Sequence, residues 1–317
     1  MSQPRRSPGH QQLIELQSRI HEYCREESAE LDHENPAHPL WLADFNYLAL
    51  APMRAGLHVE YFGETWGEPV TWTLQCLARQ DVADIVTSLA FTGPDEGANG
   101  TRDWDFGPLL EADVHFPVLR SLFVKPTEPA DHNTSLIART DLEEGGDIAR
   151  FVAKIPYLTE LTIPNAPDAS FFARQLPHLS HLRISASYDT QNFIENLALS
   201  ESLPKLRSLD FAESTELQFT WKAQRDPASI TTFAAYERLL TSKQGQALQM
   251  LRLRNTCLSL GELEALQALH PKLQFMVIQS TRGGYVSHFR RDVFPWRHLV
   301  QTDPGEDSAR YAVPKGS

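Results

Sequence analysis

A short phrase with one proline and two leucines recurs along this chain and limits its possible folds more than any other feature. The phrase reads apolar-Pro-x-Leu-x-x-Leu-x-apolar, and its clearest copies are residues 116–124, 155–163, 176–184 and 203–211. Weaker copies contain Val86, Leu89 and Phe91, then Leu248, Leu251 and Leu253, and finally Leu273, Met276 and Ile278. Recurrence of this kind is the signature of repeat architectures, so residues 82–280 are predicted to form stacked units.

The second half of each phrase predicts a short β-strand. In the copy at 155–163, Leu161 and Ile163 alternate with polar residues, which is the period of a strand with one buried face. The proline has no N–H group and can precede a strand without interrupting its ladder. Between copies the pattern is helical, as in Ile148, Phe151 and Val152. Strand followed by helix, repeated, predicts a parallel inner sheet with outer helices.

The phrase resembles the L-x-x-L-x-L motif of the leucine-rich-repeat family, from about residue 82 to residue 280. The overall pattern is similar to bacterial cytoplasmic members with irregular repeats. The resemblance implies an α/β fold, a leucine-rich-repeat solenoid shaped as a right-handed β/α horseshoe with non-repeat caps. It also implies binding of another macromolecule rather than catalysis. The Asn or Cys that usually follows the strand is mostly missing, being approximated only in residues 253–258.

The segments outside the repeats predict caps. Residues 1–31 are expected to contain an amphipathic helix, with Leu13, Leu16 and Ile20 near one stripe, which either caps the array or forms a partner-binding arm. Residues 32–81 are rich in aromatic side chains and are predicted to be an N-terminal capping segment with a strand through residues 57–62. Residues 281–317 are predicted to be a C-terminal cap and flexible tail.

Composition narrows the class of partner. The formal net charge of -12 disfavours nucleic acid, because such binders gain affinity from lysine and arginine that displace counterions. The three widely spaced cysteines suggest neither a disulfide framework nor a zinc site. No stretch is apolar enough to predict a membrane span. We therefore expect a cytoplasmic monomer that binds another protein.

No residue constellation predicts a catalytic, metal or cofactor site. His178 and His181 have a spacing that suits a metal ion on a helix, but the repeat places His181 on a strand, where positions i and i+3 face opposite ways. An enzyme with its site in residues 32–115 is one alternative. An immunity protein or antitoxin that occludes a toxin is a sharper version of the binding hypothesis.

The repeat predicts which side chains face the concave side of the sheet. The candidate partner-binding residues are Phe123, Lys125, Glu160, Thr162, His181, Arg183, Asp210, Met250, Arg252, Arg254, Phe275 and Gln279. Basic groups outnumber acidic ones in this set, which favours a protein partner with an acidic patch. The alternative is that Arg183, Asp210 and Arg252 neutralise one another as a ladder.

Overall fold

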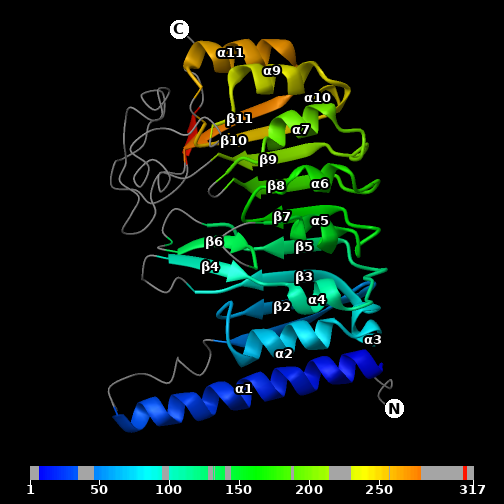
Figure 1. Cartoon of the computed structure of the whole chain (residues 1–317), viewed down its shortest axis with the longest axis vertical. Helices are drawn as coiled ribbons and strands as arrows, with labels where there is room; N and C mark the ends of the chain where they lie inside the picture. The colour runs from blue at the N-terminus through cyan, green and yellow to red at the C-terminus, as the bar shows by residue number, and fades with distance from the viewer. Residues whose placement is uncertain are drawn as a thin grey trace.

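A computed structural model describes residues 7–34, 46–94, 100–127, 131, 133–139, 144–186, 189–213, 230–256, 258–279 and 310–312. In these parts the chain forms an elongated stack with one long sheet and a column of helices along it (Figure 1). The fold is mixed α/β, with a large and mainly parallel sheet.

The main sheet has ten strands, in the order β1-β2-β3-β5-β7-β8-β9-β10-β11-β12. Their bounds are β1 Tyr47–Met53, β2 Gly56–Phe62, β3 Val86–Thr92, β5 Ser121–Val124, β7 Glu160–Ile163, β8 His181–Ser185, β9 Ser208–Ala212, β10 Met250–Arg254, β11 Gln274–Gln279 and β12 Arg310–Ala312. Strands β2 to β11 of this order pair in parallel. The first and last strands, β1 and β12, pair antiparallel with their neighbours. The predicted parallel sheet is confirmed, and it extends through the strand predicted at residues 57–62.

Helices connect the strands. They are α1 Pro8–Glu34, α2 Glu68–Leu77, α3 Gln80–Ala83, α4 Gly107–Glu111, α5 Asp147–Val152, α6 Ala169–Phe172, α7 Phe193–Leu199, α9 Phe233–Thr241, α10 Lys243–Gln246 and α11 Leu260–Leu269. Helices α2, α4, α5, α6, α7 and α9 follow one another along one side of the sheet (Figure 1). Parallel strands require such crossover connections, and these helices supply them.

Backbone hydrogen bonds between turns hold successive copies of the phrase in register. The N–H groups of Thr159 and Glu160 both donate to the carbonyl oxygen of Arg120, at 2.8 and 3.0 Å. Ser180 and His181 donate in the same way to the oxygen of Thr159, at 2.9 and 3.1 Å. Arg207 and Ser208 repeat the pattern with Ser180, and Gln249 and Met250 repeat it with Arg207. The copies are therefore adjacent rungs whose turns, as well as strands, are stacked.

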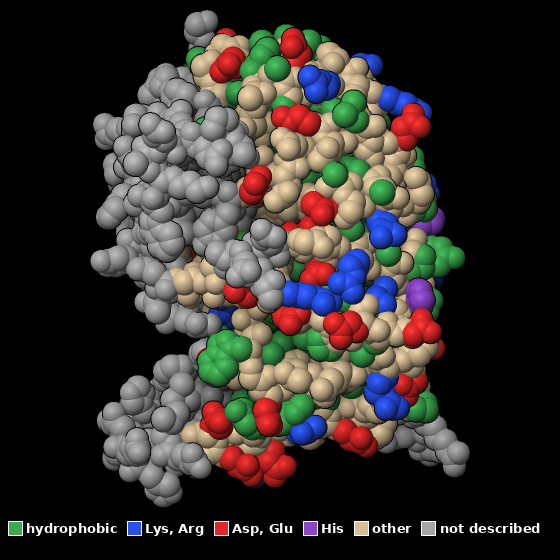
Figure 2. All heavy atoms as spheres, in the orientation of Figure 1, with side chains coloured by type: hydrophobic (Ala, Val, Ile, Leu, Met, Phe, Trp, Pro, Cys, Tyr) green, Lys and Arg blue, Asp and Glu red, His purple; other side chains and the backbone are tan. Residues whose placement is uncertain are grey.

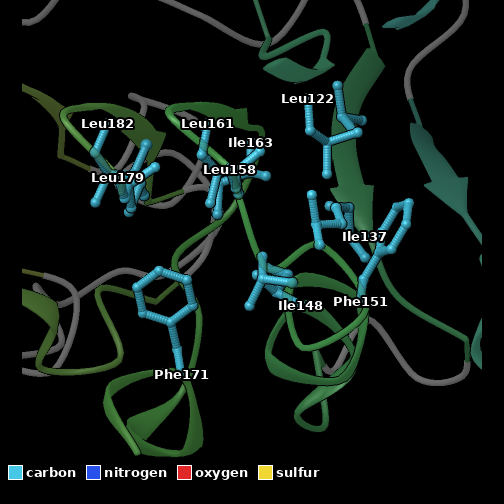
Figure 3. Close-up of a cluster of buried hydrophobic side chains, with 14 of the residues drawn as sticks. Leu122, Ile137, Ile148, Phe151, Leu158, Leu161, Ile163, Phe171, Leu179 and Leu182 are labelled. Atoms are coloured by element: carbon cyan, nitrogen blue, oxygen red, sulfur yellow. The ribbon is translucent and has the colours of Figure 1, made fainter. Parts of the chain in front are cut away.

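The core lies between the sheet and the helices. Leu122, Leu161 and Leu182 stand on neighbouring strands and are at most 2 % exposed. Ile148 and Phe151 of α5 and Phe171 of α6 point toward this leucine layer (Figure 3). Burying one such side chain stabilises the fold by about 1.5–3 kcal/mol relative to leaving it exposed. The leucines of the phrase thus stabilise the stack, as the repeat predicts.

Helix α1 covers the N-terminal end of the sheet. Leu13, Leu16 and Ile20 are buried, which confirms the predicted apolar stripe. The side-chain amide of Gln17 donates to the carbonyl oxygen of Leu48 in the edge strand β1, at 2.7 Å. An uncovered edge strand invites pairing with other chains, so α1 protects this one. Of the predicted 281–317 segment, all but Arg310–Ala312 lies outside the described residues.

A second, two-stranded sheet lies beyond the ends of β3 and β5. Strands β4 (Gly100–Trp104) and β6 (Asn133–Ile137) pair in parallel. The side chain of Asn165, two residues after β7, continues this pairing: its Oδ1 accepts from the N–H of Ile137 at 2.9 Å, and its Nδ2 donates to the Ile137 oxygen at 3.1 Å. The insertion after β5 therefore contains a strand of its own.

Buried polar residues follow three of the strands at the same distance. Asn165, Glu213 and Asn255 each stand two residues after the second apolar residue of a strand, and all three are buried. Buried polar groups at this position satisfy backbone groups of the connecting segments.

The predicted register of the last repeat is wrong by one residue. Met276, rather than Val277, pairs with Arg252, and Phe275 pairs with Leu251. Phe275 therefore faces the core, against which it packs, and is not a residue of the concave face. The run Phe275-Met276-Val277-Ile278 is apolar throughout, so alternation could not define its faces, and a slip of one residue exchanges them.

Candidate functional site

The sheet face opposite the helices, here called the open face, carries the predicted binding residues in straight rows. The pairing register places Phe123, Thr162, Arg183, Asp210 and Arg252 side by side on successive strands. The row continues through Ala90 to Glu60 at one end and to Met276 at the other. Neighbouring strands lie ~4.8 Å apart, so these side chains form a continuous surface.

Two further rows flank the middle one. One contains Ser121, Glu160, His181, Ser208 and Met250, which pair directly with one another along the sheet. Its members Glu160 and His181 are exposed. On the other side of the middle row lie Thr92, Lys125, Ser185, Ala212 and Arg254. Gln279 belongs to β11, but its side chain lies outside the described residues.

Asp210 forms ion pairs with two arginines on the open face. Its Oδ2 lies 2.9 Å from Nη1 of Arg252, and its Oδ1 lies 2.7 Å from Nε of Arg254. Nη2 of Arg254 also donates to Oδ2, at 2.9 Å. Asp210 is 7 % exposed, and a carboxylate at that depth requires such partners. Of the alternative ladder of Arg183, Asp210 and Arg252, the pair Asp210 and Arg252 is present, with Arg254 as an added partner.

Acidic side chains near the other cations balance the open face further. Nζ of Lys125 lies 3.2 Å from Oδ1 of Asp131. Glu60, on β2, also points to the open face, where it accepts a hydrogen bond from the hydroxyl of Thr92 at 2.9 Å. The sequence pattern missed Glu60 because β2 carries no copy of the phrase. Its signal was the alternation of Leu57, Val59 and Tyr61 with polar residues.

A histidine and a serine meet on the open face within the segment considered for an enzyme. Nδ1 of His58 lies 2.9 Å from Oγ of Ser88, and its Nε2 lies 3.9 Å from Oε2 of Glu60. Such a grouping can in principle activate a hydroxyl. Acyl transfer also needs N–H donors aimed at the developing oxyanion. Ser88 stands in the middle of a sheet strand, where backbone N–H groups point along the sheet to the neighbouring strands.

The buried carboxylates have structural partners. Glu144 accepts from the N–H groups of Gly146, Ile148 and Asp168, at 3.0, 2.5 and 3.2 Å, and so joins the starts of α5 and α6. Burial raises the pKa of its carboxyl, opposed by these hydrogen bonds. Glu213 accepts from the hydroxyl of Tyr236 at 2.6 Å. Burial raises the pKa of Glu213 to about 7.

The remaining reactive side chains are constrained by their surroundings. Burial raises the pKa of the Cys76 thiol to about 11, which keeps it protonated and weakly nucleophilic at neutral pH. His178 packs against the ring of Tyr157, with centroids 5.3 Å apart, and Nδ1 of His181 lies 2.9 Å from Oγ of Ser180. Among the described residues, no group of three His, Cys, Asp or Glu side chains could hold a metal ion. Within the same residues, every helix is too short or too polar to cross a bilayer.

Comparisons with known proteins identify no family for this chain and one similar structure. No protein-family profile matches the sequence, and the curated proteins contain no match. A crystal structure of a Bacteroides fragilis protein, determined as a structural-genomics target, is similar in structure at 15% sequence identity, with a TM-score of 0.43. The similarity covers 69% of this chain and 57% of that protein, so the chain spans little more than half of its length.

Proposed function

We propose that this chain is a non-catalytic protein–protein interaction module with a leucine-rich-repeat horseshoe fold. The observation that carries the proposal is the continuous open face, in which partly exposed side chains from successive strands stand in register. The repeated phrase, the parallel sheet and the buried polar residues after the strands support the family assignment. The thiol of Cys76, which forms no disulfide bond, fits a reducing, cytoplasmic setting.

The chemistry of the open face suits a protein partner. Phe123 offers an apolar contact within the middle row, while Thr162, Arg183 and Glu160 on the neighbouring strands offer hydrogen-bonding and charged groups. Protein interfaces combine apolar contacts with polar surroundings in this way. The sheet backbone is held by hydrogen bonds on both sides of each inner strand, so binding would cost little ordering of the chain.

A bulky substitution on the open face tests the proposal. Thr162→Arg introduces a long, charged side chain at the centre of the middle row, and Ala234→Arg introduces the same side chain at an exposed position of α9. Each variant is used as bait for affinity purification, and bound proteins are quantified by mass spectrometry. We expect Thr162→Arg to lose proteins that the unaltered chain and Ala234→Arg retain. Equal capture by both variants would refute an open-face site.

A further inference from the structure

We infer a second interaction surface, which fits an acidic, extended protein segment and lies along the turns that precede the strands. These turns are residues 117–120, 156–159, 177–180, 204–207, 246–249 and 271–274, and together they are called the turn edge. Their backbone hydrogen bonds stack them in the order of the strands β5, β7, β8, β9, β10 and β11. The inference does not depend on the proposed open-face site.

The charge of the turn edge is opposite to that of the whole chain. The turn residues include Arg120, Lys205, Arg207 and Lys272 and contain no carboxylate, although the chain has 41 acidic and 29 basic side chains. The nearest carboxylates in sequence belong to the flanking residues Asp113, Glu160 and Glu201. In the view of Figure 2, acidic and basic side chains are intermixed over the surface, and histidines lie at the right-hand border, where the strands begin.

An aromatic cluster lies among these cations. Tyr157 is 45% exposed, with Cζ of Arg120 at 4.8 Å from its ring centroid and His178 on the neighbouring turn. The arginines are held by their own turns: Nη1 of Arg120 donates to the oxygens of Pro117 and Leu119, and Nη1 of Arg207 donates to those of Pro204 and Leu206. Guanidiniums held in this way lose little entropy when they bind, and Arg120 beside the exposed ring of Tyr157 has the character of an interface anchor.

The dimensions of the turn edge fit an extended peptide. Five steps of ~4.8 Å separate the turn before β5 from the turn before β11, which gives about 24 Å. A strand-like peptide rises ~3.4 Å per residue, so about seven residues span the edge. Carboxylates at both ends of such a segment would reach Arg120 at one end and Lys272 at the other, with Lys205 and Arg207 between them.

Protein carboxylates fit this surface better than nucleic-acid phosphates. Nucleic-acid binders gain most of their affinity from cations that neutralise many phosphates, and the turn edge supplies few cations on a chain of net charge -12. The exposed Pro156, Pro177 and Pro204 add apolar surface beside Tyr157, which suits the side chains of a peptide. We therefore assign the surface to an acidic protein segment.

Charge reversal on the full-length chain tests the assignment. The probe is a fluorescein-labelled peptide of glutamates and one tyrosine, about eight residues long, titrated by fluorescence anisotropy at low and at physiological salt. We expect binding that weakens with salt, and a roughly tenfold weaker affinity for the double variant Lys205→Glu, Lys272→Glu. Both side chains are exposed, and neither belongs to the core. Tyr157→Ala should also weaken binding.

A matched control separates a local surface from overall charge. The double variant Arg25→Glu, Arg238→Glu changes the net charge equally at exposed helix positions and should bind the peptide as the unaltered chain does. Thr162→Arg on the open face should also leave peptide binding unchanged. The inference is overturned by absence of peptide binding, by equal loss in the control, or by tighter binding of a single-stranded oligonucleotide of similar length.

Discussion

Replacing Glu213 by glutamine should change how the stability of this protein depends on pH. Glu213 is 2% exposed and lies between β9 and α9, where it accepts hydrogen bonds from the hydroxyl of Tyr236 and the N–H of Thr231. Burial raises its pKa from 4.5 to about 7, and these hydrogen bonds oppose the rise only in part. The folded chain therefore holds a proton on Glu213 over a pH range in which the unfolded chain has released it.

The sign and size of the effect follow from this difference. Because the folded pKa is the higher one, the stabilising contribution is complete below about pH 4.5 and is lost as pH rises through about 7. Ionising the buried carboxyl over that interval costs about 3 kcal/mol. Glutamine keeps the shape and an acceptor oxygen but carries no ionisable proton. We expect Glu213→Gln to match the unaltered chain near pH 4.5 and to exceed its stability by about 3 kcal/mol at pH 8.

Urea unfolding followed by tryptophan fluorescence measures this difference at several pH values. Other carboxyls also titrate in this range, so the quantity to compare is the difference in unfolding free energy between the two proteins at each pH. Glu237→Gln removes a carboxylate at an exposed position of α9 and is the matched control for the change in overall charge. If the difference for Glu213→Gln is constant with pH, the reasoning about burial at this position is wrong.

Further substitutions test the core, the N-terminal cap and the open face. Leu182→Ala should lower the unfolding free energy in urea by about 2–5 kcal/mol, whereas Leu199→Ala, at a site 74% exposed, should change it little. Gly9→Ala places a methyl group against a backbone oxygen of the neighbouring helix α3, and it should lower stability by about 1–3 kcal/mol and increase proteolysis of α1. Asp210→Asn removes the carboxylate from its two arginines and should cost about 1–3 kcal/mol, less at high salt, as measured by urea unfolding.

The repeated phrase predicted most of the sheet because its residues act locally. Leucine at fixed spacing after proline defines a turn, a strand and a buried face together, so the strands at Leu122, Leu161, Leu182 and Leu209 could be aligned without coordinates. That alignment also placed Asp210 beside Arg252, across 42 residues of sequence. The helix predicted from Ile148, Phe151 and Val152 was right in position, because it must cover the adjacent apolar strand.

The features that the sequence did not predict depend on contacts between residues far apart in the chain, which no local pattern encodes. Phe275 was assigned to the wrong face because four consecutive apolar residues leave the register to the neighbouring strand and its turn. Glu60 was missed because β2 joins the sheet without the phrase. The burial of Glu213 depends on Tyr236 of α9, which the chain reaches only after a long connection. The carboxylates of Glu60 and Asp131, neither of which was in the predicted set, reduced the surplus positive charge expected on the open face.

Some positions of the phrase are fixed by folding and others are not, and the variable positions are therefore informative about binding. Proline and the leucines form the turn and the core, so the residue after each proline, such as Tyr157, His178, Lys205 or Lys272, contributes little to folding. Nothing in the turn geometry excludes a carboxylate there. A carboxylate at such a position would repel an acidic partner, so turns without carboxylates fit the partner proposed for the turn edge.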